Sequence, residues 1–215
     1  YFNKVSHNAD FFTKVHFTEK QIPCELIILM PILLYKYIFL DRLSVFLTFQ
    51  TNQSVTKILL LSDTHSHIDD TIIKYVKQAD QVWHAGDIGD LKVTDAIAAL
   101  KPLRAVFGNI DDPKARASFE LDLHFMCEGV SVFMTHIGGY PGRYNKRIRA
   151  GIYANPPTLF ITGHSHILKV MHCKKTGLLH MNPGAIGRHG FHKVRTMLRF
   201  EINGNNISNL ELIEL

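Results

Sequence analysis

From residue 56 onward, short apolar runs alternate with segments whose apolar side chains recur at helical spacing. The runs at 57–62, 81–84 and 103–107 are short and mostly apolar, as is typical of buried strands. Between them, the spacing of apolar residues predicts one helix over 68–79 and a second over 91–100. This alternation of strand and helix predicts a parallel sheet with helices on its faces.

The second half of the chain has a different rhythm, in which strands are paired across short turns. Glu128-Gly129 and Asn203-Gly204 are hairpin signals between such runs. A basic helix is predicted over 143–150. Further strands are predicted at 119–125, 130–135, 158–162, 168–173, 178–181, 196–202 and 207–213. Together the two halves predict an α/β protein built as a two-sheet mixed β-sandwich flanked by helices.

Residues 1–55 do not share this organisation. Leu26–Leu40 is apolar except for Lys36, is interrupted by Pro31, and is shorter than the roughly 20 residues that span a bilayer. Three interpretations stay open: an accessory extension packed on the domain, a membrane anchor formed by residues 26–49, or upstream sequence joined by a wrong start site. We therefore divide the chain into an extension, 1–55, and a domain, 56–215.

Composition narrows the class of protein without naming a partner. Hydrophobic residues make up 46% and charged residues 20% of the chain, which is ordinary for a soluble globular protein. The net charge of +5 suits an anionic substrate, but no block of Lys and Arg forms a nucleic-acid footprint. The three cysteines are widely spaced, so we expect free thiols and a cytoplasmic location. A homo-oligomer stays open.

Five clusters of potential metal ligands each follow a predicted buried strand. Their side chains are oxygen and nitrogen donors, and strand ends are where ligands gather in α/β sheets. The clusters are Asp63-Thr64-His65, Gly86-Asp87, Gly108-Asn109, Thr135-His136 and Gly163-His164-Ser165-His166. Together the clusters offer two Asp, one Asn and four His. These seven ligands are about what two neighbouring divalent metals need, and a metal pair of this kind typically serves displacement at phosphorus.

The order D-x-H, GD, GN, H and GHxH resembles that of the calcineurin-like metallophosphoesterases over residues 56–215. The short spacings resemble the small prokaryotic phosphodiesterase branch, which is related to the retromer scaffold subunit. The resemblance implies the metallophosphoesterase fold. It implies a first metal on Asp63, His65, Asp87 and His166, and a second on Asp87, Asn109, His136 and His164, with Asp87 as the bridge. The expected catalytic residues are Asp63, Asp87, Asn109 and His136.

Histidine ligands are of intermediate softness and suit transition metals better than magnesium or calcium. We expect two divalent ions, manganese first, with nickel, iron, cobalt or zinc as alternatives. The expected reaction is hydrolysis of a phosphoester, most simply a phosphodiester, by a hydroxide that bridges the ions and attacks phosphorus in line. Two alternatives stay open: a phosphomonoesterase, and a non-catalytic protein-binding scaffold on the same fold.

One position departs from the resemblance. Many members of the wider family read GNH[DE] at the third cluster, and that histidine protonates the leaving group. Here the sequence is Gly108-Asn109-Ile110-Asp111, and Ile110 has no proton to give. Members of the small branch also often carry an apolar residue or cysteine there, so activity is not excluded. Acid assistance must then come from another group or from metal-bound water, or the leaving group must be a good one.

Several residues near the clusters have two interpretations each. Asp111 and Asp112 either cap the following segment or support the ligands. Tyr140 and Arg143, on the glycine-rich loop after His136, either overhang the site or are solvated. Other candidates for indirect roles are His67 beside the first cluster and the backbone N–H groups of the loop 182–185. His189 and His192 are expected on loops without a metal.

Overall fold

The computed structural model describes residues 55–215, and we refer to these as the domain. The interpretations given for the extension therefore fall outside the described residues. Within the domain, no helix is long and apolar enough to cross a membrane.

The first sheet has the strand order β12-β11-β1-β2-β3. Its parallel part is β1 (Thr56–Leu61), β2 (Gln81–His84) and β3 (Leu103–Ala105). The hairpin of β11 (Thr196–Asn203) and β12 (Asn206–Glu214) joins it through antiparallel pairing of β11 with β1. β1 is almost wholly apolar because it is the central strand and is covered on both faces.

The second sheet has the order β4-β5-β8-β10-β9. β5 and β8 run parallel, and so do β8 and β10. The outer strands β4 and β9 pair antiparallel with their neighbours. The strands are β4 (Asp122–Cys127), β5 (Val130–Thr135), β8 (Leu159–Ile161), β9 (Leu168–His172) and β10 (Leu179–Pro183). A small separate hairpin joins β6 (Gly139–Tyr140) to β7 (Arg143–Tyr144).

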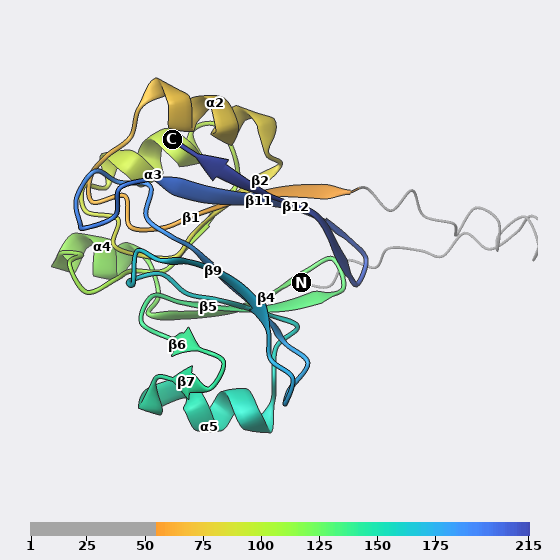
Figure 1. The fold of residues 1–215 in the computed structure, drawn as a ribbon. Helices are drawn as coiled ribbons and strands as arrows, with labels where there is room; N and C mark the ends of the chain where they lie inside the picture. Colours follow the sequence, from red (N-terminus) through yellow and green to blue (C-terminus); the bar gives the residue numbers. More distant parts are fainter. Residues whose placement is uncertain (1–54) are drawn as a thin grey trace, which may run out of the picture. The chain divides into compact units, whose positions relative to one another are not determined.

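The two sheets pack face to face, with helices on their outer sides (Figure 1). Trp83, Phe200 and Met134 belong to the core between the sheets. α2 (Asp70–Gln78) and α3 (Lys92–Ala98) cover the first sheet, and α5 (Lys146–Ala154) covers the second. The loops that leave the carboxyl ends of β1, β2, β5 and β8 emerge together at one end of the sandwich.

The predicted two-sheet α/β sandwich is confirmed, with local differences. β2 has the predicted bounds, and most other strands agree within one or two residues. β4 begins three residues later than predicted, because Phe119 caps the unpredicted helix α4 (Pro113–Ser118) and Glu120 forms an isolated bridge with Val106 instead of pairing with β5. α5 lies three or four residues after its predicted position, because β7 occupies residues 143–144 and Asn145 caps the helix.

Candidate metal centre

The structure gathers the predicted ligands at one end of the sandwich. Asp63 lies just beyond β1 and Asp87 just beyond β2, both from the first sheet. His136 follows β5 directly, and His164 and His166 follow β8, all from the second sheet. Four segments that are far apart in sequence therefore converge where the carboxyl ends of strands from the two sheets come together.

Six of the seven predicted ligands form two groups. In each group the candidate ligand atoms all lie within 4.8 Å of one another. The first group is Asp63, His65 and His166, and the second is Asp87, His136 and His164. Each group draws residues from both sheets.

Asp87 lies between the two groups. Its Oδ1 is 3.1 Å from His136 Nε2 in the second group, and its Oδ2 is 3.9 Å from His65 Nε2 in the first. Each carboxylate oxygen therefore faces a different set of ligands. This is the placement that a bridging carboxylate requires.

The ligand atoms fit a cation better than they fit one another. Asp63 Oδ1 and His136 Nε2 are buried, and their polar neighbours are other candidate ligand atoms: His166 Nε2 lies 3.2 Å from Asp63 Oδ1, and Asp87 Oδ1 lies 3.1 Å from His136 Nε2. His65 Nε2 and His166 Nε2 face each other at 3.2 Å, where one of the two must donate and the other accept. A shared cation would satisfy these buried atoms together, so the arrangement fits a metal site. The donor set of oxygen and imidazole nitrogen suits a divalent transition metal.

His136 is oriented for binding by a hydrogen bond on its far side. Its Nδ1 lies 2.8 Å from the carbonyl oxygen of Ala85, which can only accept. Nδ1 must therefore carry a proton, which leaves the Nε2 lone pair free in the neutral ring and aimed into the site.

The charges of the site favour protons where no cation is present. Burial lowers the pKa of His136, but the hydrogen bond with Asp87 and the charges of Asp63 and Asp87 outweigh it and raise the pKa overall. Asp63 likewise raises the pKa of His166. Metal binding must displace these protons, so affinity should rise with pH.

Five ligand residues have left-handed backbone conformations. These are Asp63, His65, Asp87, His164 and His166, with φ between 45° and 68°. Aspartate tolerates this region better than most residues, and the strain is consistent with a functional site. A different constraint applies at Gly108, where a Cβ atom would lie 2.0 Å from Asp87 Oδ1. The glycine of the third cluster is therefore required by the close approach of two ligand loops.

A buried carboxylate ties the loops of the second and third clusters together. Asp111 accepts hydrogen bonds from the N–H groups of Gly89 and Gly108, both at 2.7 Å. Arg116 donates to the carbonyl oxygens of Asp111 and Asn109 from the other side. Of the two interpretations for these aspartates, Asp112 caps α4, whereas Asp111 supports the ligand loops.

We expect Asp111→Ala to lower the free energy of unfolding of the metal-free protein by about 2–4 kcal/mol, because two N–H groups lose a charged acceptor. Chemical denaturation measures this change. The neighbouring variant Asp112→Asn keeps a good helix cap and should stay close to wild type. Equal stability of the Asp111→Ala and wild-type proteins would show that the carboxylate does not hold these loops.

The seventh predicted ligand, Asn109, lies at the edge of the second group. Together with His136, Arg116 and Arg147 it lines a hollow of about 290 Å³. A second hollow, of about 170 Å³, lies beside His164. Ile137, which follows the candidate ligand His136, lines both hollows.

The structure distinguishes the surroundings of His67, Tyr140 and Arg143, for which the sequence left two interpretations open. His67 binds Asp69 and Arg195, at 2.9 Å each, and belongs to neither ligand group. Tyr140 lines the second hollow, where the Lys169 ammonium lies 3.6 Å from its ring centre. Arg143 is exposed on β7.

His84 is a buried histidine with a structural role. Its Nδ1 accepts from the Gly86 N–H, and its Nε2 lies 2.9 Å from Thr64 Oγ1. Burial lowers the pKa of His84 to about 4, so the ring stays neutral behind the ligands.

In the loop 182–185, the N–H of Gly184 is used inside the domain and is not free to meet a ligand, and the N–H groups of the two residues that follow the loop are used in the same way. The N–H of Gly184 donates to Asn182 Oδ1, and those of Ile186 and Gly187 donate to the carbonyl oxygens of Ser62 and Asp63. The role of the loop is to hold the first ligand cluster in place.

His189 and His192 lie closer to the ligands than the sequence indicated. The His189 ring centre is 5.1 Å from that of His65, and the His192 ring centre is 5.2 Å from that of His166. Neither belongs to a ligand group. No periodicity or spacing in the sequence marks these contacts, because they depend on how the loop after β10 folds back.

A comparison with models of protein families shows which family the chain belongs to. The model described as the calcineurin-like phosphoesterase superfamily domain matches residues 56–205. The chain belongs to this superfamily. The ligand clusters of this calcineurin-like phosphoesterase domain all fall within the matched range. A search of curated proteins gives no match.

Solved structures show the same fold at low sequence identity. Vps29 from Entamoeba histolytica, complexed with Zn²⁺, is 16% identical, with a TM-score of 0.57; the match covers 74% of this chain and 98% of that one. A protein from Thermotoga maritima, TM1076, is 24% identical, with a TM-score of 0.57 and coverage of 74% and 99%. An archaeal phosphodiesterase is 20% identical, with a TM-score of 0.59 and the same coverage.

Proposed function

We propose that this protein is a metal-dependent phosphodiesterase that uses two divalent transition-metal ions, manganese being the first candidate. The observation that carries the proposal is the pair of ligand groups with Asp87 between them. Membership of the calcineurin-like phosphoesterases supports the reaction class, and the archaeal phosphodiesterase among the structural relatives supports diesters.

The residues of the site divide the work. Asp63, His65 and His166 would hold one ion, and His136, His164 and Asn109 the other, with Asp87 shared between them. When bound, the two ions supply positive charge for the phosphoryl oxygens and lower the pKa of the attacking water. Asp111 and Ala85 keep the ligands in place through the hydrogen bonds described above.

The two hollows beside the candidate ligands support a diester over a monoester. A diester carries two organic groups on phosphorus, and two hollows offer a place for each. Lys169 lines the hollow beside His164, where its charge suits a substrate that is negative around its phosphorus atom. In the wall of the hollow at Asn109, Arg147 is paired with Asp122, and Arg116 donates to the carbonyl oxygens of Asp111 and Asn109.

A scaffold function is the second candidate. The sequence resembles a branch related to the retromer scaffold subunit, and one structural relative is Vps29. The intact ligand groups favour catalysis in this chain. The two functions differ in turnover, since a scaffold need not hydrolyse any phosphoester.

The deciding experiment loads the purified protein with manganese, nickel, iron, cobalt or zinc and supplies an aryl phosphodiester and the matching aryl monoester. We expect metal-dependent turnover that is faster on the diester and is lost on chelation. Turnover confined to the monoester would identify a phosphomonoesterase. An absence of turnover with every metal would favour the scaffold.

We predict that residues 1–55 are dispensable for catalysis, because every predicted ligand lies after Thr56. A protein that starts at Thr56 should bind the same number of metal ions and keep its turnover within about twofold of the full chain. Elemental analysis and diester kinetics test this. A shortened protein that folds, as judged by circular dichroism, but lacks metal or turnover would show that the extension contributes to the site.

A further inference from the structure

The face that carries the metal centre has a rim of exposed apolar side chains. Three candidate ligands are each followed directly by an exposed isoleucine: Ile110 is 47% exposed, Ile137 36% and Ile167 62%. Because the ligands converge, the residues next to them surround the centre. Leu121, which lines the hollow at Asn109, is exposed as well.

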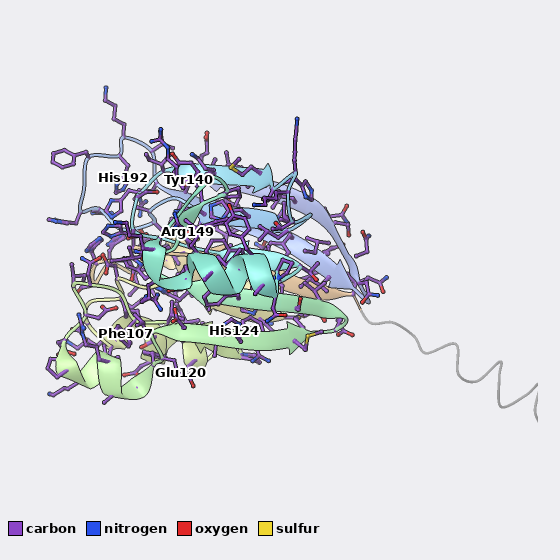
Figure 2. All side chains as sticks on the ribbon, turned by 90° about the horizontal axis from the view of Figure 1, so that it is seen from below. Phe107, Glu120, His124, Tyr140, Arg149 and His192 are labelled. Atoms are coloured by element: carbon purple, nitrogen blue, oxygen red, sulfur yellow. The ribbon has the colours of Figure 1, made fainter. Side chains whose placement is uncertain are left out.

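The loop 188–193 adds an aromatic side chain to this rim. His189 and His192 pack against the ligands His65 and His166, which places the loop on the metal face. Between them, Phe191 is fully exposed. Figure 2 shows the loop that carries His192 projecting from the end of the molecule at which Phe107, next to the third cluster, also lies. Full exposure of a phenyl ring serves no packing purpose within the domain.

Basic residues flank the exposed ring. Arg188, with 71% of its side chain exposed, and Lys193, also exposed, lie on either side of Phe191; Arg188 is 4.0 Å from the carboxylate of Asp69, which also pairs with Arg195. Lys169 adds a third cation at the hollow beside His164. Bound metal ions would make the same face more positive.

This mixture fits a lipid surface better than a protein partner. The centre of a protein–protein interface is a packed apolar patch depleted of charge. Here each apolar side chain is set among cations and metal ligands. An aromatic ring with Lys and Arg beside it is the combination that inserts into the interfacial region of an anionic bilayer.

We propose that the metal face docks on an anionic phospholipid surface, with Phe191 inserted at the level of the headgroups and Arg188 and Lys193 against the lipid phosphates. In this orientation the metal centre faces lipid phosphodiesters. The substrate class that follows, a membrane phosphodiester, rests on the proposed function, whereas the docking does not.

A tryptophan at position 191 reports on docking at this position alone. The natural tryptophan, Trp83, is buried in the core and gives a constant background. With the full-length, metal-loaded Phe191→Trp protein, we expect a blue shift of emission on vesicles of equal parts phosphatidylcholine and phosphatidylglycerol. Brominated acyl chains should quench the emission. Vesicles of phosphatidylcholine alone should produce much less of either change.

The matched control places the tryptophan at Met126, an apolar residue that is 57% exposed. Met126 pairs with Ser131 near the end of β4 away from Thr135 and the ligands. Met126→Trp should show neither a shift nor quenching on the same vesicles. An equal response at both positions, or none at position 191, would overturn the proposal.

Charge reversal tests the contribution of the cations. Arg188→Glu with Lys193→Glu should weaken binding to the anionic vesicles by at least about thirtyfold, because two favourable charges are lost and two repulsive ones are added; the emission of the Phe191→Trp protein measures this. Lys174→Glu with Lys175→Glu, at the hairpin between β9 and β10, changes the net charge equally and should have little effect. Equal weakening by both changes would show that only net charge matters and would contradict docking by this face.

Hydrolysis of a soluble aryl diester, measured on the same samples, separates the two proposals. Turnover without vesicle binding would refute the docking and leave the phosphodiesterase in place. Docking without turnover would confirm the lipid surface and refute the proposed function.

Discussion

Asp87→Ala protein is expected to lose both metal ions and, with them, its metal-dependent turnover. The two oxygens of this carboxylate face different ligand groups, 3.1 Å from His136 Nε2 and 3.9 Å from His65 Nε2. Without it, Asp63 is the remaining carboxylate in the two groups. Two dications would then repel each other across a site that has lost half of its negative charge. Elemental analysis should fall from two ions per chain to none.

Two variants separate loss of charge from loss of structure. Asp87→Asn keeps a hydrogen-bond acceptor for the Ile110 N–H and tolerates the left-handed backbone, but lacks the charge. It should fold like wild type and still bind metal poorly. Asp90→Ala removes an exposed carboxylate three residues away and should keep both ions. Two ions retained by Asp87→Ala would refute the ligand assignment.

The second large effect concerns the leaving group. Because Ile110 cannot donate a proton, the departing oxygen should leave with more negative charge. Rates on a series of aryl diesters should therefore fall steeply as the pKa of the leaving group rises. Ile110 is half-exposed, and its N–H donates to Asp87 Oδ1, which places position 110 beside the second group. Ile110→His should flatten the dependence and accelerate alkyl diesters by about 10² to 10⁴-fold.

The matched control is Ile167→His. Ile167 is also an exposed isoleucine that follows a candidate ligand, but this ligand belongs to the first group. Histidine at 167 should leave the dependence on leaving-group pKa unchanged. Flattening by Ile167→His instead would place the departing oxygen on the other side of the site. If chemistry limits the rate and the wild type already shows a shallow dependence, another residue of the protein donates the proton.

The sequence was sufficient for the architecture and for part of the convergence of the candidate ligands. Buried strands are recognisable as short apolar runs, and the carboxyl ends of parallel strands lie at one edge of a sheet. The pattern of residues alone therefore places Asp63, Asp87 and Asn109 at one edge of the first sheet. The histidines that follow strands of the second sheet were placed beside them only by the family resemblance. The division into two groups follows from side-chain positions, which only the structure provides.

Features that depend on short or irregular segments were harder to predict from the sequence. α4 has only six residues and no apolar periodicity, so Pro113 and the cap at Asp112 gave the only local signal. The support from Asp111 depends on two N–H groups from separate loops. The contacts of His189 and His192 with the ligands depend on a loop that reverses toward the first cluster, and its sequence carries no pattern for that path.

Each ligand group takes residues from both sheets, and this has a consequence for how long the protein survives in a cell. His65 and His166 are 101 residues apart along the chain, yet their Nε2 atoms are 3.2 Å apart. An ion held there would act as a reversible cross-link that closes a long loop, comparable in principle with a disulfide. Chains made when metal is scarce would lack these cross-links, open more often at this edge and be degraded sooner. Metal supply would then govern the abundance of the protein as well as its activity.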